Sequence, residues 1–194
     1  EIDTIISAVD RSKAEGQRNR AILETLYSCG LRVSELVNLK LSDLYFDEGF
    51  IKVEGKGSKQ RLVPISPRAI NEIKLYFADR HQIEVKKDYE DFVFVSQRRG
   101  KGLSRIMIFH MIKELAQNAG ITKNISPHTF RHSFATHLLE GGANLRAIQC
   151  MLGHESIATT EIYTHIDRNM LRSEIIEHHP RNIKYRREKE SGFH

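Results

Sequence analysis

Six residues of the sequence share the ability to bind, protonate or attack a phosphate ester: Arg32, Lys56, His128, Arg131, His154 and Tyr163. His128 and Arg131 are three residues apart, and Tyr163 follows His154 by nine residues. Each residue type is weak support by itself, since a lone arginine is usually solvated and a lone tyrosine usually packs in a core. Their combination in one chain indicates chemistry at phosphorus.

Such a set could break a phosphodiester bond without a metal ion. Arginine has a planar fork of donors and a permanent charge, which suit it to the oxygens of a pentavalent phosphorus. A tyrosine hydroxyl has a pKa of about 10, so as a nucleophile it needs a base or cationic neighbours. A deoxyribose hydroxyl is a poor leaving group, and a mobile lysine could supply the proton it needs. Fixed cations would supply the electrostatic stabilisation.

Local sequence patterns place these residues on helices and on one β-hairpin. Periodicity, caps and glycines predict helices over residues 3–11, 17–29, 32–39, 66–80, 104–118, 126–140, 144–152 and 167–178, and a short helix that starts at Ser156 and carries Tyr163. Residues 43–65 contain three β-type runs, and the glycine-rich turn between the second and third carries Lys56. Phe130, Phe134 and Leu138 form a stripe that we expect in the core. The predicted fold class is mainly α with a small three-stranded antiparallel sheet (α+β).

Length and composition indicate one globular domain. The chain has 194 residues, of which 40% are hydrophobic and 28% charged, and these values are ordinary for a domain with a core. No apolar stretch approaches the ~20 residues of a membrane span, and the acidic start EIDTIISAVDRS lacks the positive region of a secretory signal. Two cysteines, Cys29 and Cys150, are too few for a disulfide framework and are expected in the core. We therefore expect a cytoplasmic protein, and a first residue other than methionine suggests a piece of a longer chain.

The net charge of +5 is unevenly distributed along the chain. Residues 92–139 contain seven Lys or Arg residues, four histidines and one acid, Glu114. A basic block in an otherwise balanced chain favours a surface for a polyanion, although a merely solvated face would have the same composition. The tail 181–194 contains five Lys or Arg residues and two glutamates. Because this basic tail has few apolar residues, and because Pro180 is expected to end the preceding helix, we predict that it is disordered.

Four segments resemble the tyrosine recombinases of the phage integrase family, closest to its Xer and integrase branch: GLRVSEL, GKGSKQRLVPI, SPHTFRHSFATHLLEGGANLRAIQCMLGH and SIATTEIYTHI. The resemblance extends from about residue 1 to Arg181, and the ordered set Arg, Lys, His-x-x-Arg, His, Tyr is highly specific. It implies that residues 1–180 form the catalytic domain of a site-specific DNA recombinase, with the fold shared by the type IB topoisomerases. It also implies that the family's N-terminal core-binding domain is absent from this chain.

The resemblance implies a role for each candidate residue. Tyr163 would attack the scissile phosphate and form a 3′-phosphotyrosyl link, and His128 would assist removal of its proton. Lys56 would protonate the leaving 5′-oxygen. The non-bridging oxygens would be held by Arg32, Arg131 and His154. Glu35, one helical turn after Arg32, would orient its basic neighbours rather than react.

The implied partner is double-stranded DNA with a specific recombination site, and no cofactor or metal is implied. The resemblance further implies a tetramer on DNA, formed with copies of the chain or with a sister recombinase through the helix 167–177. The alternative for that helix is that its apolar stripe packs in its own domain. Such a protein would act on the nucleoid in the cytoplasm, and the same catalytic domain serves chromosome-dimer resolution, integration and inversion.

Three other functions remain open from the residues. A zinc site could use His128 and His132, four residues apart, or Cys150 and His154, but these spacings match no standard zinc pattern. A type IB topoisomerase would relax DNA without pairing two sites, and a DNA-binding module could keep the fold without activity. A covalent protein–DNA adduct formed in EDTA would exclude the metal site and the pure binder. Strand exchange between two sites would exclude the topoisomerase.

Overall fold

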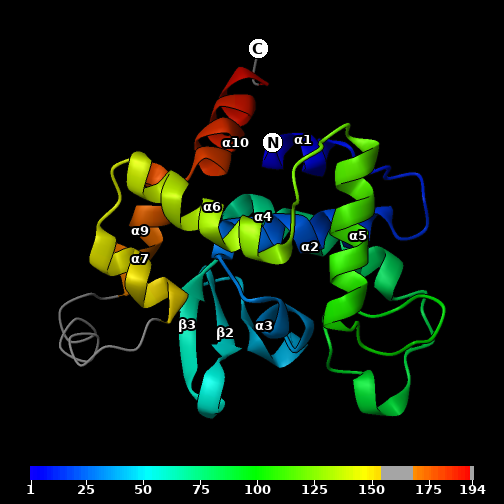
Figure 1. Ribbon diagram of the computed structural model, residues 1–194. Coiled ribbons are helices and arrows are strands. Elements are labelled where there is room, and N and C mark those ends of the chain that lie inside the picture. Colours follow the sequence, from blue (N-terminus) through cyan, green and yellow to red (C-terminus); the bar gives the residue numbers. More distant parts are fainter. Residues whose placement is uncertain (154–167, 193–194) are drawn as a thin grey trace.

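The computed structural model describes residues 1–153 and 168–192, which form a mainly helical body with one small sheet (Figure 1). The helices are α1 (Ile2–Ser7), α2 (Gly16–Cys29), α3 (Val33–Val37), α4 (Pro67–Arg80), α5 (Arg105–Asn118), α6 (Pro127–Glu140), α7 (Leu145–Leu152), α9 (Arg168–His178) and α10 (Pro180–Ser191). The strands are β1 (Leu44–Tyr45), β2 (Phe50–Glu54) and β3 (Gln60–Pro64). The predicted fold class is confirmed, and the helix expected to start at Ser156 lies outside the described residues.

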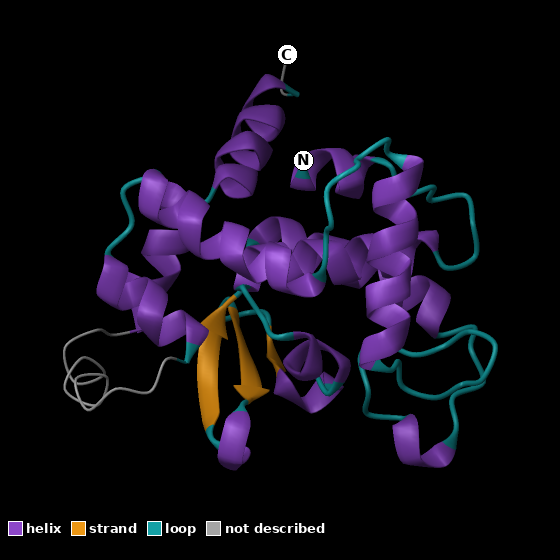
Figure 2. Ribbon diagram, in the orientation of Figure 1, coloured by secondary structure: helices purple, strands orange, loops and turns teal. Residues whose placement is uncertain are grey.

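The three strands form an antiparallel meander in the order β1-β2-β3, which lies below the central helices in the view of Figure 2. In the register of the second hairpin, Ile51 pairs with Val63 and Val53 pairs with Arg61. Directly paired residues lie on the same face of a sheet. The face that carries buried Ile51, Val53 and Val63 therefore also carries Arg61, a position where a charge needs a partner.

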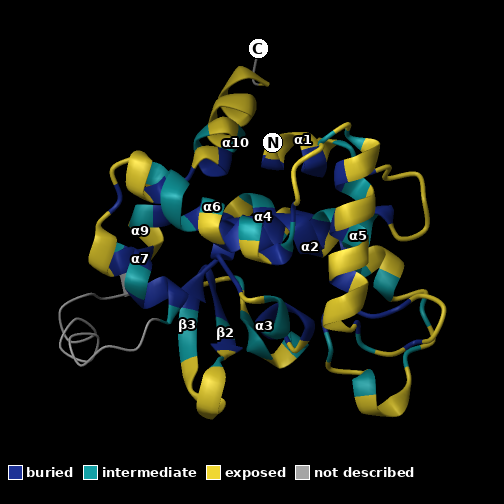
Figure 3. Ribbon diagram, viewed as in Figure 1, coloured by how far each residue is buried: buried dark blue, intermediate teal, exposed yellow. Residues whose placement is uncertain are grey.

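Helix α2 is the centre of the core and packs against α4 and α6. The structure buries every residue of this helix from 21 to 29, polar residues included, as the dark colour of α2 in Figure 3 shows. Gly30 ends the helix at φ 65°, and a Cβ there would lie 2.3 Å from the Phe134 ring of α6. Glycine is thus required both by the left-handed backbone and by the close approach of α6.

Several helix starts are confirmed where the sequence predicts a capping side chain. Ser104 Oγ accepts a hydrogen bond from Met107 N at 3.2 Å, and Asn144 Oδ1 accepts from Arg146 N at 2.9 Å. These bonds satisfy N–H groups that the first turn of a helix leaves unpaired. The predicted core stripe of α6 is also confirmed, since Phe130, Phe134 and Leu138 are fully buried. Helix α1 ends at Ser7, four residues earlier than predicted.

The prediction that residues 181–194 are disordered is wrong for the part that the structure describes. Pro180 starts α10 instead of ending the preceding helix, because a proline at the first helical position lacks only an N–H that has no partner there. Arg181 is buried and donates to Glu24 of α2 and, at 2.7 Å, to Asp3 of α1. Composition underestimates this helix because its two acidic partners lie more than 150 residues away in sequence.

Helix α9 packs within its own domain. Its apolar residues Leu171 and Ile175 are buried, and the helix contacts β3, α6, α7 and α10. The intramolecular alternative therefore describes the single chain, and docking of this helix on a neighbouring protomer on DNA stays a prediction. Within the described ranges, no helix has the length and apolar character needed to cross a membrane.

Candidate active site

Arg32 and Glu35 are held together at the start of α3. Arg32 is the residue before the helix, and its backbone N–H donates to Glu35 Oε1 at 2.9 Å, which forms a capping interaction. The Arg32 side chain is 42% exposed, and its Nη1 lies 3.9 Å from Glu35 Oε2. The backbone of Arg32 is thus fixed while its guanidinium remains open to a ligand.

Arg131 extends from α6 toward the same point and is almost completely buried. It donates from Nη1 to Gly30 O at 2.6 Å and from Nη2 to Leu152 O at 2.7 Å, so it ties the end of α2 to the end of α7. Burial, aided by the charge of Arg32, lowers the pKa of Arg131 to about 10, so the side chain is a cation at neutral pH.

Glu35 is the carboxylate around which three guanidinium groups gather. Its oxygens accept from Arg61 on β3, and Oε1 lies 4.0 Å from Arg131 Nη1. Burial raises the pKa of Glu35, but the hydrogen bonds and charge of Arg61, together with the N–H of Arg32, outweigh it and lower the pKa overall. One ionised carboxylate among three arginines leaves a local excess of positive charge that suits a phosphate. We call Arg32, Glu35, Arg61 and Arg131 the arginine cluster.

Lys56 lies where the sequence predicts, on the exposed turn that joins β2 to β3. The turn is a short 3₁₀ segment, Lys56–Ser58, and it is closed by a 2.7 Å hydrogen bond from Gly55 N to Lys59 O. Gly57 adopts φ 73°, which other residues rarely adopt. Lys56 is therefore at the tip of a hairpin that carries Arg61, a member of the arginine cluster, close to the same turn.

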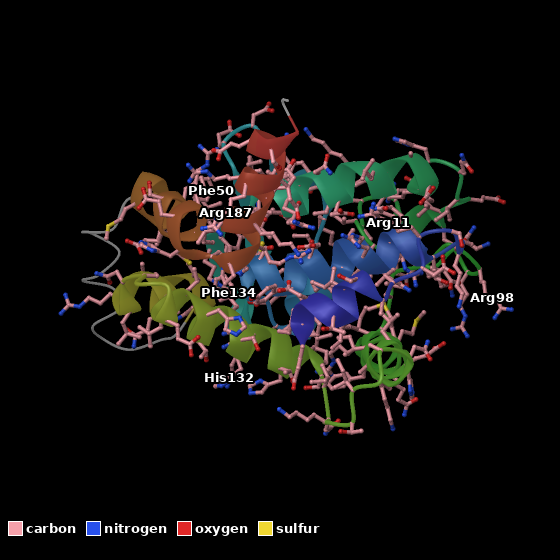
Figure 4. All side chains as sticks on the ribbon, turned by 90° about the horizontal axis from the view of Figure 1, so that it is seen from above. Arg11, Phe50, Arg98, His132, Phe134 and Arg187 are labelled. Carbon is pink, nitrogen blue, oxygen red and sulfur yellow. The ribbon has the colours of Figure 1, made fainter. Side chains whose placement is uncertain are left out.

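The candidate histidines of α6 differ in their surroundings. His128 is exposed at the N-terminal end of the helix, one turn before Arg131. His132 is exposed on the outer side of α6, away from Phe134 (Figure 4). His137, half-buried, has its Nδ1 2.6 Å from the hydroxyl of Tyr27. His137 thus packs within the fold, whereas His132 faces outward.

The two remaining candidates, His154 and Tyr163, lie outside the described residues. The chain is described up to Gly153, which ends α7 at φ 70° beside Arg61. It is described again from Arg168 of α9. The structure therefore brings together Arg32, Glu35 and Arg131, and leaves the positions of His154 and Tyr163 as predictions.

Of the candidate ligands of the alternative metal site, His128, His132 and Cys150 lie in the described residues and His154 does not. In the ranges 1–153 and 168–192, no three His, Cys, Asp or Glu side chains lie close enough to bind a metal ion together. Cys29 and Cys150 are both buried, as expected for small core residues.

The basic block 92–139 lies at the surface. Six of its seven Lys or Arg residues are exposed, on α5 and the loops around it, and Arg131 is the buried exception. Arg98, for instance, lies at the outer edge of the molecule (Figure 4). The block thus contributes exposed cations and, through Arg131, one cation of the arginine cluster.

Arg61 is the site residue that sequence reasoning missed. It lies in the run GKGSKQRLVPI, two residues before Val63 and so on the same face of the strand. A charged residue in phase with a buried residue predicts a buried partner of opposite charge. That signal was present, and Glu35 is the partner.

Comparison with known proteins agrees with this arrangement. Residues 1–170 match the model of the phage integrase family. The chain is 45% identical over 181 residues to the tyrosine recombinase XerD of Halalkalibacterium halodurans, which covers 93% of this chain and 60% of that protein. It is 51% identical over 164 residues to XerD of Chlorobaculum tepidum, covering 84% of this chain and 54% of the relative. The chain thus spans less than two thirds of the length of these relatives.

Solved structures have the same fold. The crystal structure of XerA recombinase superposes with a TM-score of 0.70 at 36% identity, over 92% of this chain and 63% of that one. The XerH site-specific recombinase bound to its difH substrate, in a pre-cleavage complex, gives a TM-score of 0.69 at 30% identity, over 86% and 49% of the two chains. From its arginine cluster, its fold and these matches, the chain belongs to the phage integrase family of tyrosine recombinases.

Proposed function

We propose that this chain is the catalytic domain of a site-specific recombinase that cuts and rejoins DNA strands through a 3′-phosphotyrosyl intermediate on Tyr163. The observation that supports this best is the arginine cluster, in which Arg131 is buried and Arg32 is open to a ligand. A buried cation with spare donors beside an exposed one suits a phosphodiester whose charge increases in the transition state.

In the proposed reaction, a new phosphate ester bond forms for each one that breaks. The Tyr163 oxygen attacks phosphorus, the bond to the 5′-oxygen breaks, and Lys56 gives that oxygen a proton. His128 takes the proton from Tyr163. Attack by a 5′-hydroxyl on the phosphotyrosyl link then rejoins a strand and frees the tyrosine. Each step replaces one phosphate ester with another, so the proposal requires no cofactor and no metal.

Arg131 has donors left for this task. Two of its N–H groups hold the carbonyls of Gly30 and Leu152, and a guanidinium has five. The two carbonyl bonds fix the plane of the group before substrate arrives, which is the preorganisation that electrostatic catalysis needs. Arg32 and His154 are proposed to complete the contacts to the non-bridging oxygens.

The proposed partner is double-stranded DNA that contains a specific site, because the structure of a relative, XerH, holds its difH substrate. Assembly into a tetramer, with copies of the chain or with a sister recombinase, is proposed for paired sites. The apolar stripe of α9 is not a free contact surface in the single chain, since Leu171 and Ile175 are buried there. We propose that the protein acts on the nucleoid in the cytoplasm.

Two experiments in EDTA test the proposal. A pool of nicked duplexes of random sequence is incubated with the chain, and covalent adducts are separated in denaturing detergent and sequenced. Two duplexes of different length that carry a captured site are then mixed. The proposal predicts adducts in the first experiment and hybrid-length products in the second. Adducts without hybrid products would favour the topoisomerase, and specific binding without adducts would favour the non-enzymatic module.

A further inference from the structure

Arg61 uses every nitrogen of its guanidinium to join separate parts of the site. Nη1 and Nη2 donate to the two carboxylate oxygens of Glu35, the second at 3.0 Å, and Nε donates to Met151 O at 2.9 Å. Its side chain is 7% exposed and that of Glu35 is 1% exposed. A two-pronged bond between buried opposite charges has a fixed geometry.

The first connection runs through Glu35 to α3. Glu35 Oε1 accepts from Arg61 and from the backbone N–H of Arg32, and it also lies 4.0 Å from Arg131 Nη1. A rotation of the carboxylate would release the N–H of Arg32 and change the charge facing Arg131. The position of Glu35 therefore depends on Arg61.

The second connection runs to the last turn of α7. The final carbonyls of a helix lack partners within the helix. Arg61 binds that of Met151, and Arg131 binds that of Leu152. A Cβ at Gly153 would lie 3.1 Å from Arg61 Nε, so the arginine packs directly against the residue that precedes His154. Two arginines thus hold the end of α7 in place.

The third connection is covalent and runs to Lys56. Arg61 pairs with Val53, one pair before the end of the hairpin whose turn carries Lys56. Because the Arg61 side chain is fixed to α3 and α7, the strand that carries it is fixed as well. This connection adds directed bonds to the core packing of Ile51, Val53 and Val63, which also holds the hairpin.

We propose that Arg61 is a positioning residue for strand cleavage, one that holds Glu35, the end of α7 and the turn end of the Lys56 hairpin in a single arrangement without contacting the scissile phosphate. The inference rests on the function proposed above. All the Arg61 nitrogens already have protein partners, which distinguishes it from Arg32 and Arg131.

The test compares two buried arginines. Arg61→Lys keeps the charge but cannot make three directed bonds. Arg68→Lys is the matched control, because Arg68 is also mostly buried and its Nε lies 3.2 Å from Glu24, outside the arginine cluster. We expect Arg61→Lys to slow single-turnover cleavage by about 100-fold, the effect of a small misplacement of reacting groups, with DNA affinity nearly unchanged. Arg68→Lys should cleave at the wild-type rate.

A wild-type cleavage rate in folded Arg61→Lys would overturn the proposal. So would a loss of DNA affinity as large as the loss of rate, which would make Arg61 a phosphate contact. Arg61→Gln, which keeps two hydrogen-bonding groups without the charge, serves as a second variant if the lysine variant does not fold. In a double-mutant cycle with Glu35→Gln, the cleavage rate of the double variant should equal that of the slower single variant. If the two fold-losses in rate multiply instead, Arg61 does not act through Glu35.

Amide hydrogen exchange tests the positioning without any cleavage. In Arg61→Lys, exchange should accelerate at residues 32–37 and 151–153, and in Arg68→Lys it should stay at the wild-type rate in both segments. Unchanged exchange in both segments of Arg61→Lys would refute the role even if the enzyme is active. If exchange accelerates in Arg61→Lys but the wild-type chain forms no covalent adduct, the proposed function is refuted while the role of Arg61 in holding these segments stands.

Discussion

Arg131 shows how one residue can serve both the fold and the site. Its bonds to Gly30 O and Leu152 O join α2, α6 and α7, and its remaining donors are proposed to bind phosphate. Arg131→Lys should retain a positive charge but lose the fork that spans both carbonyls. We expect cleavage to slow by about 10²–10³-fold, as for the loss of one donor to a transition-state oxyanion. Single-turnover assays on a nicked duplex measure this, and an unchanged rate would reject the assignment.

Lys56 makes a different prediction, because the hairpin tip leaves it exposed. If Lys56 is the general acid, Lys56→Ala should be slow on ordinary DNA and fast on a substrate whose 5′-bridging oxygen is replaced by sulfur, since a thiolate leaves without a proton. Lys59→Ala, three residues along the same turn, is the control. No recovery on the sulfur substrate, with DNA binding intact, would assign Lys56 to phosphate binding.

His179 predicts how stability depends on pH. Its Nε2 lies 3.1 Å from Tyr27 O and its Nδ1 accepts from Arg181 N, so the neutral ring satisfies both contacts. Burial lowers the pKa of His179 to about 4. Between that value and about 6.5 the unfolded chain binds the extra proton, so stability falls as pH falls through this window. The loss should reach about 3 kcal/mol.

Urea unfolding between pH 7 and pH 4 measures this loss. His179→Asn keeps a capping side chain for α10 but does not titrate. The free energy of unfolding of this variant should be lower than that of the wild type at pH 7 and should decline less toward pH 4. Parallel pH curves for the two proteins would show that His179 is not the group responsible.

At the scale of the elements, the accurate predictions from sequence have local causes, although the end of α1, also a local feature, lies four residues earlier than predicted. Ser104 and Asn144 cap the helices they were expected to cap, and the glycine-rich run forms the hairpin turn. The other errors arise where partners are distant in sequence. Helix α10 depends on a buried arginine whose acids lie in α1 and α2, and Arg61 depends on Glu35. Local composition carries no information about such pairs.

The docking of α10 gives an element-scale prediction. Arg181→Ala would remove one of the two arginines that pair with buried Glu24 and leave only Arg68. Removing one partner of a buried ion pair costs several kcal/mol, so we expect a loss of about 3 kcal/mol in unfolding free energy. Arg187→Ala, on the exposed part of the same helix (Figure 4), should change it by less than about 0.5 kcal/mol. Equal effects would show that α10 is not fixed by Arg181.

At the scale of the whole molecule, the arginine cluster lies where three helix ends and one strand meet. The end of α2, the start of α3, the end of α7 and strand β3 each contribute a backbone group or a side chain to it. The family resemblance predicted that Arg131 lies near Arg32 and Glu35, although a long stretch of sequence separates it from them. It carries no comparable information for Arg61, whose role follows from the three-dimensional contacts.

The central claim is that Tyr163 is the nucleophile, and one measurement tests it most directly. The chain and its Tyr163→Phe variant are incubated in EDTA with a nicked duplex captured from the random pool, and the adduct is digested and sequenced by mass spectrometry. The account predicts an adduct whose modified peptide carries the nucleotide on Tyr163, and no adduct in the variant although it still binds the duplex. A wild-type yield of adduct from Tyr163→Phe, or a nucleotide attached to another residue, would contradict it.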